Sequence, residues 1–384
     1  MKKKLVRITT VPISLDKLLS GQLRYMNQFY EVIGVSSEPE ALKKLGEKEN
    51  IATYAIGLTR KITPITDIIA IIQLTRFLRK TNPFIVHTHT PKAGLVGMIA
   101  ARFAGVPHRL HTVAGLPLVE ATGVKRIILN WVEKITYAFA TKVYPNSKGL
   151  LDFIQQEKFC PPSKLKVLAN GSSNGIDTHF FDRSQVDYKL LEKLTPTLGL
   201  TSDDFVFIYV GRLVKDKGIH EMVNAFVRLA KEYKQVKLLL VGEPEPELDP
   251  LQDSTLKTIQ EHNNIITTGF QYDVRPYFAL AHCLIFPSYR EGFPNVVLQA
   301  GALAVPAIVS NINGCNEIIQ HEVNGLIIPV KDENAIFESM KLLVSNTDVL
   351  ETMKQVSRSM IINRYEQDVI WQALLEEYQQ LEYV

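Results

Sequence analysis

Short apolar runs alternate with longer segments of helical periodicity along the whole chain. We expect parallel strands in the first half at residues 4–9, 30–35, 52–56, 85–88, 109–112, 142–145 and 166–168. We expect further strands in the second half at 205–210, 237–241, 265–268, 283–286, 307–310 and 326–328. Between the runs, apolar residues recur at helical spacing, as in 67–80, 93–104 and 219–233. This alternation predicts an α/β protein built from βαβ units with parallel sheets.

The length of the chain predicts more than one domain. At 384 residues it is too long for one ordinary core and suits two domains of average size. We expect an N-terminal Rossmann-like domain over residues 1–185 and a C-terminal one over 186–365, facing a central cleft. The polar stretch 182–204, which contains Pro196 and Gly199, is the expected junction. A last helix within 366–384 is expected to pack back on the first domain.

Composition narrows the class of protein. The net charge of +3 gives no argument for nucleic acid, and no apolar run is long enough for a membrane span or a signal peptide. The cysteines, Cys160, Cys283 and Cys315, are odd in number and far apart, which predicts reduced thiols in a cytoplasmic protein. No spacing typical of a metal site is present, so we expect neither a metal ion nor a cofactor.

The segments that follow two of the apolar runs carry the candidate chemistry. Gly211-Arg-Leu-Val-Lys-Asp-Lys217 follows the run 205–210, and Pro287-Ser-Tyr-Arg-Glu291 follows the run 283–286. Ligands of open α/β sheets bind beyond the carboxyl ends of the strands, where helix N-termini point at them. Arg212, Lys217 and Glu291 are therefore expected to converge. Two cations and a carboxylate suit a ligand with a diphosphate at one end and hydroxyls at the other, such as a nucleotide sugar.

Each residue type suggests a role toward such a ligand. Arg212 forks onto phosphate oxygens and Lys217 supplies a point charge, while Gly211 lets the backbone approach the ligand. Because a leaving diphosphate gains negative charge, these cations would stabilise the transition state. A carboxylate beside an anionic ligand has to face its hydroxyl groups, so Glu291 is assigned to the sugar. Gln299, two turns along the following helix, can bond ribose hydroxyls.

Several motifs together resemble a known family. Residues 210–218, 287–295 and 324–329 are similar to retaining glycosyltransferases of family 4, which have the GT-B fold. Residues 87–94, 105–109 and 170–177 resemble the bacterial members that build capsule, O-antigen and lipid-linked oligosaccharides. The resemblance spans nearly the whole chain and is strongest over 205–330.

The resemblance implies roles for particular positions. Arg212 and Lys217 would hold the donor diphosphate, and Glu291 would contact the donor sugar. Further donor contacts are implied for the phosphate and sugar at Phe293, Pro294, Asn295 and Val296, for the base at Gly269, Phe270 and Gln271, and for the phosphates at Gly21. Three positions depart from the pattern. The family usually has glutamate at Gln299, many members have histidine at Ala114, and the first-domain glycine pair near the phosphates is Ser20-Gly21 here. His111, His89 or the leaving phosphate itself would then serve as the base.

The acceptor side is less sharply marked. His89 and Lys92 follow the run 85–88 and are assigned to an acceptor phosphate or sugar, although polar residues at a helix start explain them equally well. Residues 125–135 place basic side chains beside an apolar stripe. A core-facing amphipathic helix is the favoured interpretation, and a helix at a membrane surface is the alternative.

The sequence thus predicts a metal-independent, retaining glycosyltransferase. It would move a sugar from a nucleotide sugar, UDP being the expected nucleotide, to a polyprenyl-diphosphate-linked glycan at the inner face of the cytoplasmic membrane, in surface polysaccharide biosynthesis. Two alternatives remain open: a non-catalytic nucleotide-sugar-binding subunit, suggested by Ala114 together with Gln299, and a nucleotide-sugar epimerase of the same fold.

Overall fold

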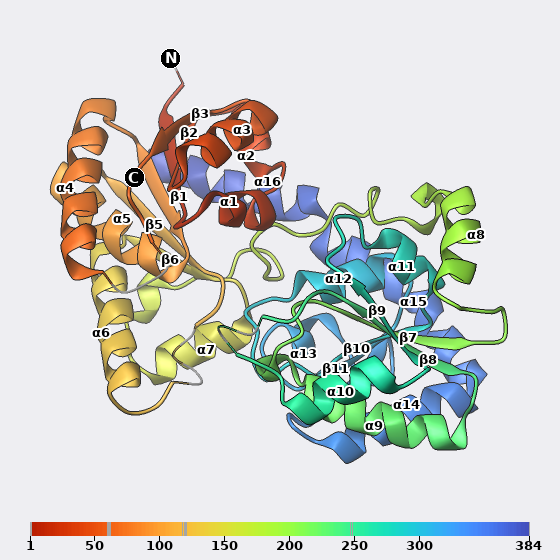
Figure 1. Ribbon diagram of the computed structural model, residues 1–384. Helices are drawn as coiled ribbons and strands as arrows, with labels where there is room; N and C mark the ends of the chain where they lie inside the picture. The colour runs from red at the N-terminus through yellow and green to blue at the C-terminus, as the bar shows by residue number, and fades with distance from the viewer. Residues whose placement is uncertain are drawn as a thin grey trace. The chain divides into compact units, whose positions relative to one another are not determined.

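The chain folds into two compact units. The structure, a computed structural model, describes residues 2–59, 63–116, 118, 121–245, 247 and 249–383. One unit consists of Met1–Asn174 and Asp368–Val384, and the other of Gly175–Gln367. Each holds a six-stranded parallel sheet with helices between successive strands, the Rossmann-like arrangement that the sequence predicts (Figure 1). The expected junction at 182–204 lies inside the second unit, because its helix packs on that unit's core.

The first unit has the strand order β3-β2-β1-β4-β5-β6. Its strands are β1 (Lys4–Ile8), β2 (Glu31–Ser36), β3 (Ala52–Ala55), β4 (Ile85–His89), β5 (His108–Val113) and β6 (Lys142–Pro145). Its helices are α1 (Pro12–Leu18), α2 (Gln22–Met26), α3 (Pro39–Glu49), α4 (Pro64–Thr81), α5 (Pro91–Ala104), α6 (Gly123–Phe139), α7 (Lys148–Gln156) and α16 (Gln367–Gln380). The strand order reverses direction between β1 and β4.

Two apolar cores cover the two faces of this sheet. On one face, strand residues such as Val6 and Val86 pack against α4, α5, α6 and α7. On the other face, Leu5 and Ile85 pack against α1, α2, α3 and α16. Alternate residues of each strand therefore serve opposite cores, as the pleat of a strand requires. The expectation that the last helix packs on the first domain agrees with the burial of Leu375 in α16.

The second unit has the strand order β12-β11-β10-β7-β8-β9. Its strands are β7 (Phe205–Val210), β8 (Val236–Val241), β9 (Ile265–Gly269), β10 (Cys283–Phe286), β11 (Ala307–Ser310) and β12 (Gly325–Ile328). Its helices are α8 (Tyr188–Thr197), α9 (Ile219–Glu232), α10 (Asp253–Glu261), α11 (Arg275–Leu280), α12 (Asn295–Ala302), α13 (Cys315–Ile318), α14 (Glu333–Ser345) and α15 (Thr347–Tyr365).

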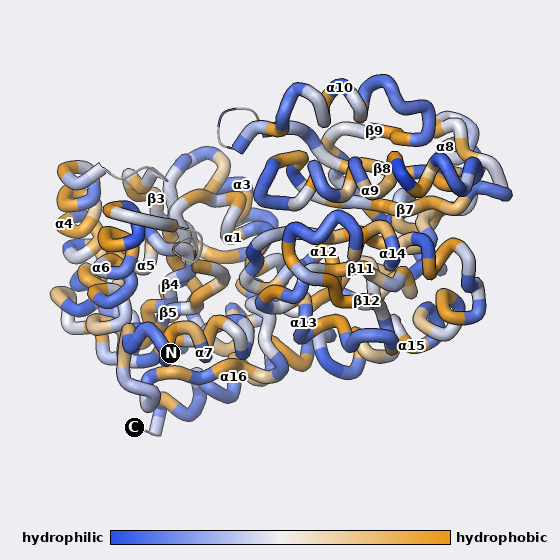
Figure 2. The backbone as a smooth tube through the Cα atoms, turned by 90° about the horizontal axis from the view of Figure 1, so that it is seen from below, coloured by the Kyte–Doolittle hydropathy of each residue, from blue (hydrophilic) through white to orange (hydrophobic). Residues whose placement is uncertain are grey.

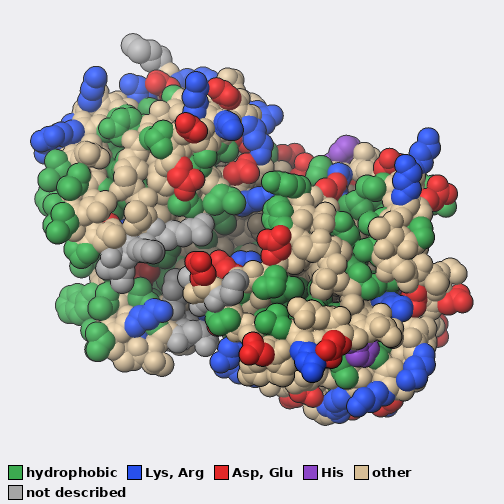
Figure 3. All heavy atoms as spheres, in the orientation of Figure 1, with side chains coloured by type: hydrophobic (Ala, Val, Ile, Leu, Met, Phe, Trp, Pro, Cys, Tyr) green, Lys and Arg blue, Asp and Glu red, His purple; other side chains and the backbone are tan. Residues whose placement is uncertain are grey.

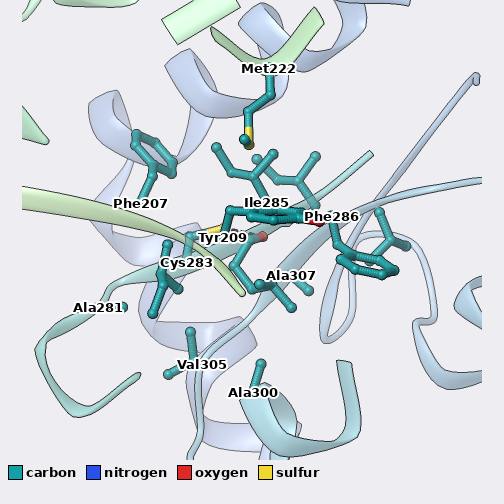
Figure 4. Close-up of a cluster of buried hydrophobic side chains, with 14 of the residues drawn as sticks. Phe207, Tyr209, Met222, Ala281, Cys283, Ile285, Phe286, Ala300, Val305 and Ala307 are labelled. Carbon is teal, nitrogen blue, oxygen red and sulfur yellow. Dashed lines mark hydrogen bonds between the residues drawn. The ribbon is translucent and has the colours of Figure 1, made fainter. Parts of the chain in front are cut away.

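One continuous core fills the second unit. Its strands form hydrophobic stretches of the chain (Figure 2), as strands buried on both faces should. Phe207, Tyr209 and Ile285 from the central strands meet Met222 of α9 on one side of the sheet (Figure 4). The two site-bearing loops leave from β7 and β10, so this core gives them a rigid base.

Most of the predicted strands are confirmed to within a residue or two. The strand expected at 166–168 is wrong. Among the described residues, this segment joins β6 through one isolated bridge, between Val143 and Leu165, and forms no strand. A short apolar run next to the edge of a sheet can pack without pairing along its length.

Candidate functional site

The candidate site lies where the strand order of the second sheet reverses. β7 is hydrogen-bonded to β8 on one side and to β10 on the other, so the connections leave β7 and β10 toward opposite sides. In a doubly wound sheet this point opens a crevice at the carboxyl ends of the strands. The loops that follow β7 and β10 carry Arg212, Lys217 and Glu291.

Lys217 and Glu291 meet directly. Lys217 Nζ donates to Glu291 Oε1 at 2.5 Å, and the two side chains are only 15% and 20% exposed. Ser288 lies beside both groups, with its Oγ 3.2 Å from Glu291 Oε1 and 3.5 Å from Lys217 Nζ. The structure thus brings together two residues that are far apart in the sequence, as the strand-end argument predicted.

The two loops are fastened to each other by further contacts. Tyr289 N donates to the carbonyl of Asp216 at 2.9 Å, and Arg290 Nη2 lies 3.0 Å from Asp216 Oδ2. Gly218, at a φ of +69°, passes so close to Pro287 that an added Cβ would lie 2.3 Å from its carbonyl oxygen. Only glycine fits there, so the backbone holds Lys217 at a fixed distance from the β10 loop.

Arg212 points toward a different partner. It is exposed and forms an ion pair with Glu245, which follows β8. Its main chain is held by Tyr209, whose hydroxyl donates to the carbonyl of Arg212 at 2.9 Å. Burial of that hydroxyl raises the pKa of Tyr209 well above its usual value, so it stays a donor. Sequence reasoning did not identify Glu245 and Asp216 as ion-pair partners of Arg212 and Arg290, because these contacts join residues that are far apart in the chain.

The helix after Glu291 begins at the same edge of the sheet. α12 starts at Asn295, with Pro294 as the preceding residue and Phe293 buried against Tyr365 at 5.3 Å between ring centroids. The first N–H groups of a helix have no partner within it and favour an anion. Asn295 is exposed, and Val296 and Gln299 are partly buried. These positions suit donor contacts from backbone and side chain together.

The loop after β9 contributes an exposed aromatic pair. Phe270 and Tyr272 lie edge to face with their centroids 5.0 Å apart, and they are 55% and 93% exposed. Gly269 takes a φ of +68° at the turn, and Gln271 Nε2 donates to Thr268 O at 2.9 Å. The phenylalanine ring thus contacts Tyr272 and is still more than half exposed, at the end of the strand where the resemblance places the nucleotide base.

The first unit has its own reversal point, between β1 and β4. His89, at the end of β4, is 1% exposed, and its Nε2 lies 2.9 Å from Nη2 of the equally buried Arg7. Since arginine only donates, His89 Nε2 accepts this bond. Burial and the neighbouring guanidinium hold the pKa of His89 well below its usual range. His89 is therefore a neutral, structurally engaged side chain.

Arg7 is the feature of this unit that sequence reasoning missed. Its guanidinium also donates to Gln22 Oε1 at 2.7 Å. Among the described residues no carboxylate contacts it, and its Nε and Nη1 have no hydrogen-bond partner. Beside it, His89 and Gln22 line a cavity of about 20 Å³, which has room for a water molecule but not for a sugar. A buried cation inside an apolar-looking strand leaves no signal in the sequence.

The other residues assigned to the first unit are also engaged. Lys92 Nζ pairs with Asp67 Oδ2 at 2.5 Å. His111 is 2% exposed, and its Nδ1 lies 2.8 Å from Thr88 Oγ1, while burial lowers its pKa to about 4. At Gly21, the space that a side chain would take is filled by the ring of Trp371, at 2.8 Å from an added Cβ. Of the three acceptor-side residues, only Lys92 is placed near the surface.

Two further features of the described residues bear on the chemistry. In the described parts of the chain, no group of three or more histidine, cysteine or carboxylate side chains is arranged to hold a metal ion. Within the same residues, no helix combines the length and apolar character that crossing a membrane requires.

Comparisons with known proteins agree with the architecture. Residues 192–360 match the family described as glycosyl transferases group 1, and residues 32–171 match the glycosyl transferase 4-like domain. The chain is 33% identical to the capsular polysaccharide biosynthesis glycosyltransferase CapM of Staphylococcus aureus over 98% of this chain and 97% of that protein. It is 28% identical to the UDP-Gal:alpha-D-GlcNAc-diphosphoundecaprenol alpha-1,3-galactosyltransferase of Escherichia coli, over 95% of each.

A solved structure shows the same fold. HepE of Anabaena in complex with UDP superposes with a TM-score of 0.81 at 20% identity, covering 99% of this chain and 100% of HepE. Both halves of the chain thus match family domains, and a relative of more than 30% identity matches nearly its full length. The chain therefore belongs to the glycosyltransferase family that these two domains define, the glycosyl transferases group 1 and the glycosyl transferase 4-like domain.

Proposed function

We propose that this glycosyltransferase moves a sugar from a UDP-sugar to a lipid-linked glycan with retention of the anomeric configuration. The observation that carries the proposal is the Lys217–Glu291 pair at the reversal point of the second sheet. A cation and a carboxylate side by side match a donor whose diphosphate and sugar ring adjoin each other.

The pair has unused capacity for such a ligand. A lysine ammonium carries three N–H donors, of which two reach Glu291 and Ser288, and a carboxylate offers several acceptor positions, so both groups keep capacity for a ligand. Lys217 would bind the diphosphate, and Glu291 would accept hydrogen bonds from sugar hydroxyls. The exposed side chain of Arg212 and the first N–H groups of α12 would add further positive potential at the diphosphate. This potential would not require a metal ion. Phe270 would stack on the base.

Retention follows from a transfer on the front face of the donor. The acceptor hydroxyl attacks the anomeric carbon from the side of the leaving group, the bond from that carbon to the phosphate oxygen breaks, and the hydroxyl proton passes to the departing phosphate. No side-chain base is needed for these steps. The burial of His89 and His111 and the presence of Ala114 favour this route over one that uses a histidine.

The acceptor is proposed from the relatives. The name of the Escherichia coli relative specifies a GlcNAc-diphosphoundecaprenol acceptor, and that of the Staphylococcus aureus relative specifies capsular polysaccharide biosynthesis. By analogy the chain would act on a polyprenyl-diphosphate-linked glycan in surface polysaccharide biosynthesis, at the inner face of the cytoplasmic membrane.

Substitution of the pair tests the proposal. Lys217→Met and Glu291→Gln should each lower turnover of the UDP-sugar by about 10²- to 10³-fold, the usual effect of losing one charge-stabilising contact. Lys215→Met is the matched control, because Lys215 lies in the same short turn but is exposed. Its turnover should equal that of the parent. Parent-like turnover in either pair variant would show that the site assignment is wrong.

The same assay separates the alternatives. A donor that binds but releases no UDP with any acceptor would indicate a binding subunit. A donor converted to another sugar nucleotide without acceptor would indicate an epimerase. Turnover that is unchanged by a chelator is expected, and turnover restored only by a divalent ion would contradict metal independence.

A further inference from the structure

α4 turns an apolar stripe toward solvent. Ile65, Ile68, Ile69 and Ile72 are 46–77% exposed, and their spacing places them on one face of the helix. The opposite face already fills the core through residues such as Leu74, which is fully buried. The outer face of a surface helix is normally polar. Core packing therefore does not explain why these exposed positions are isoleucines.

α6 repeats this arrangement. Val124, Ile127, Ile128, Trp131 and Ile135 are 36–72% exposed and follow the same helical spacing. The sequence pattern favours a core-facing role for this stripe, but the structure turns it outward. The core contacts of α6 come from other residues, among them the fully buried Tyr137.

The two stripes share one side of the first unit. α5 packs against both α4 and α6, and all three helices cover the same face of the sheet. Figure 3 shows apolar side chains gathered over α4 and α6 along the left edge of this unit. We call the exposed residues Ile65, Ile68, Ile69, Ile72, Val124, Ile127, Ile128, Trp131 and Ile135 the α4–α6 patch. Exposed apolar stripes on two neighbouring parts of one face are typical of an interaction site.

The patch lies at the functional edge of the sheet. In a parallel βαβ unit each helix starts where the preceding strand ends. The patch occupies the first turns of α4 and most of α6, so it lies toward the carboxyl ends of the strands. β4 ends at the same edge with His89, and Lys92 follows it. A partner bound to the patch would therefore lie on the side where an acceptor is expected.

Charge identifies the kind of partner. Arg76, Lys80, Lys125 and Lys134 are exposed on α4 and α6. The acidic residues of these two helices are Asp67, which pairs with Lys92, and Glu133, which is 3% exposed. Two copies of the patch facing each other would bring these cations together, which disfavours a dimer. Isoleucines and a tryptophan flanked by cations instead suit an anionic lipid surface.

We propose that the α4–α6 patch docks on an anionic phospholipid bilayer. The apolar stripes would enter the boundary between headgroups and acyl chains, Trp131 would lie at the headgroup level, and the lysines and arginines would contact lipid phosphates. This proposal extends the proposed function, because a lipid-linked acceptor is met at a bilayer. Docking itself requires neither substrate, so it is tested separately.

Vesicle sedimentation tests the docking. The full chain is mixed with phosphatidylcholine vesicles that contain phosphatidylglycerol, and with vesicles of phosphatidylcholine alone. We expect binding to the anionic vesicles that weakens with added salt. The paired variants Ile68→Ser with Ile72→Ser, and Ile128→Ser with Trp131→Ser, should each lower the partition coefficient at least tenfold. Leu190→Ser, at an exposed leucine of α8 in the other unit, is the matched control and should bind like the parent.

The outcomes are distinct. Circular dichroism and thermal melting establish that the variants are folded, which these exposed positions allow. Failure of the parent to bind vesicles, or equal binding by the patch variants, would overturn the proposal. A concentration-dependent dimer that the same variants abolish would show that the patch joins two copies, which also overturns it. Vesicle binding without any sugar transfer would leave the docking standing and reject the proposed function.

Discussion

Replacing Gly218 by alanine tests how closely the two site loops depend on each other. In the structure Gly218 has a φ of +69°, and an added Cβ would lie 2.3 Å from the carbonyl oxygen of Pro287. Both the conformation and the contact oppose a side chain. Because the contact is with backbone, the β10 loop has to move to relieve it.

The expected cost has two parts. A left-handed conformation costs a residue other than glycine about 1 to 2 kcal/mol. Overpacking against an atom that cannot rotate away adds about 1 to 3 kcal/mol. Gly199 provides the matched control, because its φ is +65° and no atom lies within 4 Å of an added Cβ. Gly199→Ala should therefore show the conformational part alone.

Scanning calorimetry measures the difference, and turnover shows its consequence. For a unit of this size each 1 kcal/mol corresponds to a shift in Tm of roughly 2 to 4 °C. Gly218→Ala should lower the Tm of the second unit by several degrees more than Gly199→Ala. It should also lower turnover, since Lys217 and Glu291 sit on the two loops that separate. Equal losses of Tm in the two variants, with unchanged turnover, would refute the reasoning.

Two further predictions concern the first unit. Burial raises the pKa of Glu133 to about 7, so the folded state favours the protonated carboxylic acid. The contribution of Glu133 to stability is therefore present at low pH and is lost as the pH rises toward about 7. Glu133→Gln should therefore gain stability relative to the parent between about pH 5 and 8, by on the order of 3 kcal/mol; a difference in unfolding free energy that is constant with pH would contradict this. Tyr378→Phe removes the hydroxyl 2.6 Å from His87 Nδ1 and should cost about 1 to 3 kcal/mol in urea unfolding, without changing UDP binding to the second unit. Tyr383→Phe, at a tyrosine that is 92% exposed, should cost nothing measurable.

Much of the fold was predictable because its strands are buried on both faces. Runs such as Phe205–Val210 and Cys283–Phe286 are apolar throughout, and they alternate with helical periodicity. The prediction was wrong where a short apolar run did not have to form a strand, or a polar stretch did not have to form a linker. Leu165 touches β6 at one bridge only, and the polar stretch at 182–204 contains a helix that packs on the second core instead of a linker.

The site was predictable in part for a related reason. Strand ends in a parallel sheet lie along one edge, so loops after neighbouring strands meet, as Lys217 and Glu291 do. The ion-pair partner of Arg212 was not predictable, because Glu245 follows a different strand, β8, and is not part of a recognisable motif. The fully buried charge of Arg7 was not predictable either, because a single cation in an apolar run reads as a surface residue.

The sequence by itself determined the order of strands and helices, the family to which the chain belongs, and the loops that carry the candidate chemistry. These depend on local periodicity and on residues close together in the chain. Only the tertiary structure decided which side of each helix is covered. The stripes of α4 and α6 have the spacing of core-facing residues, yet the sheet takes up other faces of both helices and leaves the stripes exposed. An amphipathic pattern predicts that a helix has two different faces. The contacts between distant segments determine which of the two faces is exposed to water or to a membrane.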